Sequence, residues 1–103
     1  MDLSIKTSET DGTSRVAVTG EVDVSNAAKL REAVDGALAA GAERVEVDLG
    51  EVSYIDSTGI GVLVGAAHRA EEGGVAFEVA NPQRNVRRVL GLLGVERELH
   101  VGE

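Results

Sequence analysis

The sequence predicts a single α/β domain. Its sheet is mixed and has four to five strands, with an N-terminal hairpin followed by parallel strand–helix units and helices gathered mainly on one face. Two observations carry this prediction. Strand-like and helix-like segments alternate after the first twenty residues, and a helix between two strands makes them parallel through a right-handed crossover. In addition, Val45, Val47 and Leu49 alternate with charged residues, which indicates a sheet with one face only partly covered.

The N-terminal hairpin is predicted from two alternating segments and a turn. Residues 3–7 alternate between apolar or β-branched and polar side chains, as in a half-buried strand. Asp11-Gly12 is a turn signal, and residues 16–19 alternate again. Gly20 is expected to end this second strand.

A first helix is predicted over residues 25–40, because apolar side chains recur there every three or four positions. These side chains are Ala27, Leu30, Val34, Ala37 and Leu38. Asp23 or Ser25 can cap the start of this helix, and Gly41 lies where a helix usually stops. A third strand is expected over residues 45–49.

A second helix is predicted over residues 57–72, and Gly73-Gly74 closes it. Its expected buried side chains are Ile60, Leu63, Val64 and Ala67. Residues 75–79 are predicted to form a fourth strand. Asn81-Pro82 then predicts the start of a third helix, because it places a capping residue before a proline at the first helical position.

The third helix is expected to end at Gly94, and residues 97–101 are a candidate for a short last strand. Its expected buried side chains are Val86, Val89, Leu90 and Leu93. The chain has 103 residues, enough for one modest core and too few for two. Residues 1–103 are therefore predicted to form one domain.

Composition disfavours several classes of partner. The net charge is −8 and the only aromatic residues are Tyr54 and Phe77, whereas nucleic-acid binders use basic and stacking side chains. Cysteine is absent, which removes disulfides, thiolate catalysis and cysteine-based metal sites. The longest apolar segment, residues 60–67, is too short to cross a bilayer. No secretory signal is visible at the N-terminus, so we expect a cytoplasmic protein that binds neither nucleic acid nor membrane.

The segment Tyr54-Ile55-Asp56-Ser57-Thr58-Gly59-Ile60 is the strongest candidate for a functional site. It lies where a strand passes into a helix, whose first N–H groups lack partners within the helix and create a positive field. A hydroxyl there is fixed, exposed and suited to carry a removable phosphate. Gly59 is expected to leave the backbone bare beside Ser57 for an approaching protein or nucleotide. The alternative is an ordinary helix cap, a common use of Asp, Ser and Thr.

No set of catalytic residues accompanies this segment. A nucleophile elbow needs glycine two residues before Ser57, and Ile55 stands there. His68 is roughly 16 Å further along the predicted helix, at about 1.5 Å per residue, and His100 cannot be placed. Residues 59–65 resemble a dinucleotide fingerprint, but the third glycine falls one residue late; small residues packing a helix close to the sheet explain this run. We therefore expect neither an enzyme nor a cofactor.

Two motifs together resemble those of the anti-sigma factor antagonists, the single-domain members of the STAS family. The first is Gly20-Glu21-Val22-Asp23, and the second runs from Val52 to Leu63 around Asp56-Ser57-Thr58-Gly59. The resemblance covers nearly the whole chain and implies a STAS-like fold. This sequence has Thr58 where a second serine is frequent and Ile60 where leucine is frequent.

The resemblance also implies site residues. Ser57 corresponds to the serine that is phosphorylated, with Thr58 as the second candidate acceptor, and Asp23 corresponds to an aspartate that lies near the acceptor and contacts the partner. The resemblance implies no metal ligand. The implied partner-binding residues are Glu21, Asp23, Asp56, Ser57, Thr58, Gly59 and Ile60.

The implied partner is an anti-sigma factor that is also a serine kinase, a GHKL-type ATPase. The unphosphorylated antagonist binds this kinase and frees the sigma factor, phosphorylation breaks the complex, and a serine phosphatase restores it. The free protein is expected to be a monomer. The alternative, also drawn from STAS domains, is a subunit of a membrane transport or lipid-handling ATPase, or of a stress-sensing scaffold, that docks without phosphorylation.

Overall fold

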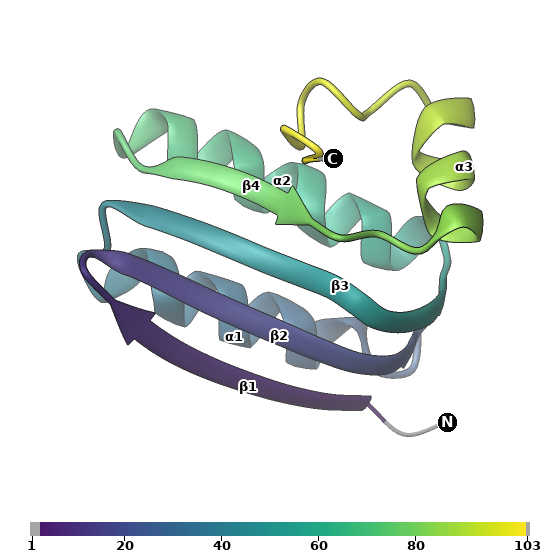
Figure 1. The fold of residues 1–103 in the computed structure, drawn as a ribbon, viewed down its shortest axis with the longest axis horizontal. Helices are drawn as coiled ribbons and strands as arrows, with labels where there is room; N and C mark the ends of the chain where they lie inside the picture. Colours follow the sequence, from purple (N-terminus) through teal and green to yellow (C-terminus); the bar gives the residue numbers. More distant parts are fainter. Residues whose placement is uncertain (1–2, 103) are drawn as a thin grey trace.

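The computed structural model describes residues 3–102 and contains a four-stranded mixed sheet with three helices (Figure 1). The elements are β1 (Leu3–Thr10), β2 (Thr13–Val22), α1 (Ala27–Ala39), β3 (Arg44–Ile55), α2 (Ser57–Glu72), β4 (Ala76–Ala80) and α3 (Arg84–Leu92). The strand order in the sheet is β1-β2-β3-β4, the same as the order in the chain. The predicted fold class is confirmed.

The first two strands form the predicted hairpin, and the remaining strands are parallel. β1 pairs antiparallel with β2, while β2 with β3 and β3 with β4 pair in parallel. Figure 1 shows α1 and α2 behind the sheet and α3 beyond the end toward which β2, β3 and β4 run. The two long helices therefore cover one face, and the carboxyl ends of the parallel strands meet the start of α2.

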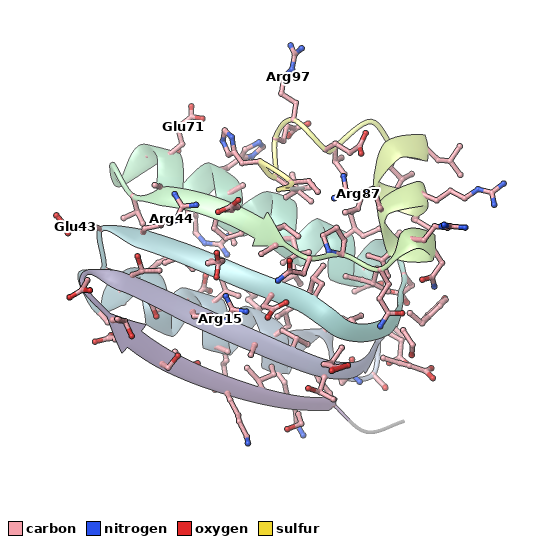
Figure 2. The ribbon with its side chains drawn as sticks, viewed as in Figure 1. Arg15, Glu43, Arg44, Glu71, Arg87 and Arg97 are labelled. Carbon is pink, nitrogen blue, oxygen red and sulfur yellow. The ribbon has the colours of Figure 1, made fainter. Side chains whose placement is uncertain are left out.

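The two faces of the sheet have different chemistry. Val, Leu, Ile and Ala side chains of the inner face pack against α1 and α2. On the outer face, Arg15 of β2 forms ion pairs with Glu46 and Asp48 of β3, and Arg44 pairs with Glu78 of β4 (Figure 2). These pairs lie between neighbouring strands, and they account for the charged residues that alternate with valine and leucine in β3.

The second and third strands are longer than predicted. Gly20 does not end β2, which continues to Val22, and β3 continues past residue 49 to Ile55. The pairing between the two strands shifts twice, each time with an extra residue in β3. Such bulges interrupt the two-residue period of a strand, which is why the second half of β3 did not show in the alternation. β4 lies one residue further along the chain than predicted.

The first two helices follow their predicted patterns with small differences. α1 begins at Ala27, two residues later than predicted. α2 has the predicted bounds, but Val64 is half-buried, whereas Ala66 and Ala70 are fully buried beside Leu63. Small side chains on this face let α2 lie close to the rest of the core.

The start of the third helix was predicted wrongly. Asn81 has a φ of 56°, so it lies in the left-handed region instead of acting as a helix cap, and Pro82 precedes the helix. α3 starts at Arg84, after Gln83. The side-chain Nε2 of Gln83 donates to the carbonyl of Gly50 in β3, at 3.0 Å, and this contact joins the residue before the helix to β3.

The C-terminal segment also differs from the prediction. Val89 is half-buried, and Leu93, expected in the core, is 52% exposed. Residues 97–101 do not form a fifth strand; a single parallel bridge joins Val79 to Val101. Within residues 3–102, no helix has the combined length and apolar character needed to cross a membrane.

Candidate functional site

The candidate site lies where β2 and β3 end side by side. Their last paired residues are Val22 and Ile55. One residue further on, the backbone N–H of Asp56 donates to the carbonyl of Val22, at 3.1 Å. This bond joins the turn between β3 and α2 to the turn between β2 and α1. The two sequence motifs, thirty residues apart in the chain, are therefore neighbours in space.

Asp56 caps α2. Its backbone is extended, and its Oδ1 accepts from the N–H of Thr58 at 3.0 Å and from the N–H of Gly59 at 3.1 Å. A carboxylate in this position satisfies two helix N–H groups and lies in the favourable field of the helix end. The predicted alternative, an ordinary cap, therefore describes Asp56.

Ser57 and Thr58 are not used for capping. Both residues are exposed in the first turn of α2. Within residues 3–102, neither hydroxyl takes part in a hydrogen bond. The cap therefore fixes the backbone and leaves two adjacent hydroxyl groups open to solvent.

Removal of the capping carboxylate gives a first testable result. Asp56→Ala is expected to lower the free energy of unfolding by about 1 kcal/mol, because two helix N–H groups lose their acceptor. Asp56→Asn keeps an acceptor oxygen and is expected to stay within a few tenths of a kcal/mol of the wild type. Urea denaturation measures both variants. An alanine variant as stable as the asparagine variant would contradict the assignment of the cap.

Gly59 has a different role from the one expected. It is buried, and a Cβ atom built on it would lie 2.6 Å from Cγ1 of Val22 and 2.8 Å from Cγ1 of Ile55. The glycine therefore lets the first turn of α2 pack against the ends of β2 and β3 and does not bare the backbone to a partner. Ile60 is also buried, so it packs in the core under the first turn of α2 and does not face the surface.

The turn between β2 and α1 is held by two side chains. The amide of Asn26 accepts from the N–H of Asp23 and donates to the carbonyl of Glu21, both at 2.9 Å. The carboxylate of Asp23 accepts from the backbone N–H and the hydroxyl of Ser25. Asp23 and Ser25 thus do not cap α1 with their side chains; the backbone carbonyl of Asp23 accepts from the N–H of Ala27, at 2.8 Å.

The hydrogen bonds from Ser25 lower the pKa of Asp23. The hydroxyl of Ser25 is the largest cause, followed by the Ser25 backbone N–H, and both stabilise the ionised carboxylate. Asp23 is therefore ionised at neutral pH. Because the pKa is lowered in the folded state, this group favours folding above its ordinary pKa. That contribution is lost as the pH falls through the lowered value.

Ser25→Ala is expected to raise the pKa of Asp23 toward its ordinary value. The variant loses the hydroxyl and keeps the backbone N–H, so part of the lowering should remain. NMR titration of the Asp23 carboxyl carbon measures the change. An unchanged titration midpoint would show that the hydroxyl does not hold the carboxylate.

Two exposed apolar residues of this region had no predicted role: Tyr54 belongs to the candidate segment 54–60, and Val24 was not named. Val24, between Asp23 and Ser25, is 76% exposed, and Tyr54, which is paired with Glu21 across β2 and β3, is 49% exposed. An apolar residue between two turn-forming polar residues is a signal that could have identified Val24. Glu21 is half-buried. The surface at the strand ends therefore combines carboxylates, two hydroxyls and exposed apolar groups, a composition suited to binding a protein.

The two histidines lie away from these hydroxyls. His68 is in the last third of α2, where its Nε2 lies 3.1 Å from Oε2 of Glu98. His100 lines a pocket with Ala67 and Glu71, at the other end of α2 from Ser57. Neither can serve as a base for Ser57.

The family model described as "Mlab, STAS domain" matches residues 5–101 of this chain. An anti-sigma-B factor antagonist of Staphylococcus epidermidis is 31% identical over 103 residues, which are all of this chain and 95% of that protein.

Solved structures with the same fold include two anti-sigma factor antagonists. One, from Mycobacterium paratuberculosis, has a TM-score of 0.89 at 24% identity and covers 97% of this chain and 85% of that one. The other is SpoIIAA of Bacillus. Its unphosphorylated form has a TM-score of 0.80 at 22% identity, covering 97% of this chain and 89% of that one. Its phosphorylated form has a TM-score of 0.74 at 20% identity, with coverage of 97% and 92%.

Proposed function

Because the chain belongs to the STAS domain family, we propose that it is an anti-sigma factor antagonist controlled by phosphorylation of Ser57. In its unphosphorylated form it binds an anti-sigma factor that is also a serine kinase, and so releases the sigma factor. Phosphorylation breaks this complex, and a serine phosphatase restores it. In this proposal the protein is a cytoplasmic regulator and not an enzyme.

This proposal rests on one observation, namely that the Ser57 hydroxyl is exposed and makes no hydrogen bond within residues 3–102. Ser57 is exposed in a turn fixed by the Asp56 cap, and that cap leaves its hydroxyl free. A kinase needs an acceptor hydroxyl that it can reach and that keeps one position. The names of the relatives support the regulatory role, and the two forms in which SpoIIAA was solved support the modification.

Phosphorylation requires a nucleoside triphosphate supplied by the kinase. The Oγ of Ser57 forms a bond to the γ-phosphorus of ATP while the bond from that phosphorus to the bridging oxygen breaks. ADP leaves, and the proton of the hydroxyl passes to a base on the kinase. The phosphatase reverses the modification by transferring the phosphoryl group to water.

The phosphate acts through charge. It adds about −1.5 to −2 charges at neutral pH to a protein that already carries −8. Asp56 and the ionised Asp23 lie at the same end of the sheet, directly after the neighbouring strands β3 and β2. The N–H groups of Thr58 and Gly59 are already bonded to Asp56, so they cannot neutralise the added charge without displacing the cap. Local repulsion can therefore end binding with no change of fold.

The proposed partner is tested by affinity purification of the tagged protein from cells that produce it, followed by mass spectrometry. We expect a GHKL-type ATPase to co-purify. After incubation with this ATPase and ATP, phosphopeptide mapping is expected to place the phosphate on Ser57. Recovery of a membrane ATPase alone would instead support the transport or lipid-handling alternative, and a purified kinase that leaves Ser57 unmodified would contradict the proposed switch.

A further inference from the structure

A groove between α1 and α2 begins beside the candidate site. We call it the α1/α2 groove; its volume is about 280 Å³, and its lining residues are Arg31, Thr58, Gly61, Val62, Gly65 and Arg69. Thr58 lines this groove, whereas Ser57 does not. Gly61 was expected to bring the helix close to the sheet, but a Cβ atom on it would meet nothing within 4 Å. The missing side chain of Gly61 leaves the groove open.

Arg31 supplies a cation on the α1 side of the groove. Its side chain is 63% exposed, and its Nε lies 3.5 Å from Oδ2 of Asp35. Arg69 holds the other oxygen of Asp35 through two hydrogen bonds, at 2.7 and 3.1 Å. Arg31 can therefore turn away from Asp35 without leaving that carboxylate unpaired.

Arg31 makes one contact of 3.5 Å with Asp35, whereas two hydrogen bonds, at 2.7 and 3.1 Å, hold the guanidinium of Arg69 there. Along α2, Arg69 is also eleven residues beyond Thr58, or roughly 16 Å at about 1.5 Å per residue. The N–H groups of Thr58 and Gly59 are bonded to Asp56. Of the two cations that line the groove, Arg31 is thus the one free to turn toward a negative charge on Thr58.

We propose that Arg31 is a receptor for a phosphoryl group carried by Thr58, whereas a phosphoryl group on Ser57 remains in solvent. The inference rests on the proposed function in one respect only, namely that the start of α2 is phosphorylated. The two adjacent hydroxyls are then not equivalent. A phosphate on Thr58 is paired within the protein and presents less charge to a partner, and a phosphate on Ser57 presents its full charge.

Proteins carrying phosphothreonine at position 58 or phosphoserine at position 57, installed by genetic-code expansion, test this directly. The ³¹P NMR signal of each is followed against pH, in the wild-type background and with Arg31→Ala. A guanidinium beside the phosphate favours its dianion. We therefore expect the midpoint of phosphothreonine 58 to lie about one pH unit lower with Arg31 than without it. The phosphoserine 57 midpoint is expected to be the same in both backgrounds. Arg88→Ala, an exposed arginine of α3 outside the groove, is the matched control.

Equal titration midpoints of the phosphothreonine 58 phosphate with and without Arg31 would contradict the proposal that Arg31 binds this phosphate. An equal effect of Arg31 on both phosphorylated positions would overturn the claim that the hydroxyls differ. The proposed function fails by a different measurement, because it requires phosphoserine 57 to weaken binding of the anti-sigma factor whatever the ³¹P result.

Discussion

Ser57→Asp is expected to weaken binding of the anti-sigma factor by up to about a thousandfold. One additional negative charge about 4 Å from an acidic group of the interface costs up to about 4 kcal/mol at an effective dielectric of about 20, and every 1.4 kcal/mol or so is tenfold in affinity. The loss should not come from unfolding, because a carboxylate in the first turn of a helix is stabilising. Ser57→Ala is expected to keep the affinity of the wild type and to resist phosphorylation at this position.

Two matched variants separate local charge from other effects. Ser57→Asn has the size of the aspartate variant without its charge, and we expect it to bind far more tightly than Ser57→Asp. Ser8→Asp adds the same charge at an exposed position of β1, outside the candidate site, and should change the affinity little. Isothermal titration measures all of them. Similar affinities for Ser57→Asp and Ser57→Asn would show that charge at this position does not control binding.

Gly59→Ala is expected to lower the free energy of unfolding by about 1–3 kcal/mol, the usual cost of overpacking a core. Its Cβ atom would collide with Val22 and Ile55, at the point where the ends of β2 and β3 support the first turn of α2. The helix propensity of alanine offsets at most about 1 kcal/mol of this cost. Urea denaturation measures the change.

Gly36→Ala is the control for this variant. Gly36 is an exposed residue inside α1, and a Cβ atom on it would meet nothing within 4 Å. There the propensity gain acts alone, so we expect stabilisation by up to about 1 kcal/mol. If Gly59→Ala were as stable as Gly36→Ala, the close packing beneath the candidate site would be refuted.

The sequence predicted those parts of the fold in which one periodicity persists. α2 has the predicted bounds because its apolar side chains keep helical spacing between a capping segment and Gly73-Gly74. The second half of β3 was missed because two bulges space the buried residues Leu49, Val52 and Ile55 three positions apart. Asn81-Pro82 gave a wrong start for the third helix, because asparagine is suited both to a helix cap and to the left-handed backbone that it adopts here.

The residues of the candidate site could be predicted from the sequence, but the separate role of each residue could not. The strand-to-helix junction identified Asp56, Ser57 and Thr58, and a cap needs only one of them. Only the geometry assigns the cap to Asp56 and places Thr58, but not Ser57, in the α1/α2 groove. The packing role of Gly59 depends on contacts with two strands, which no local pattern reports.

The most direct test of the proposed switch compares unmodified protein with protein carrying phosphoserine at position 57. Both are titrated calorimetrically with the co-purifying anti-sigma factor in the same buffer, and circular dichroism confirms that both are folded. The proposal requires the dissociation constant to rise at least about a hundredfold on phosphorylation, as a charge penalty of several kcal/mol implies. Equal dissociation constants for the two proteins would contradict it.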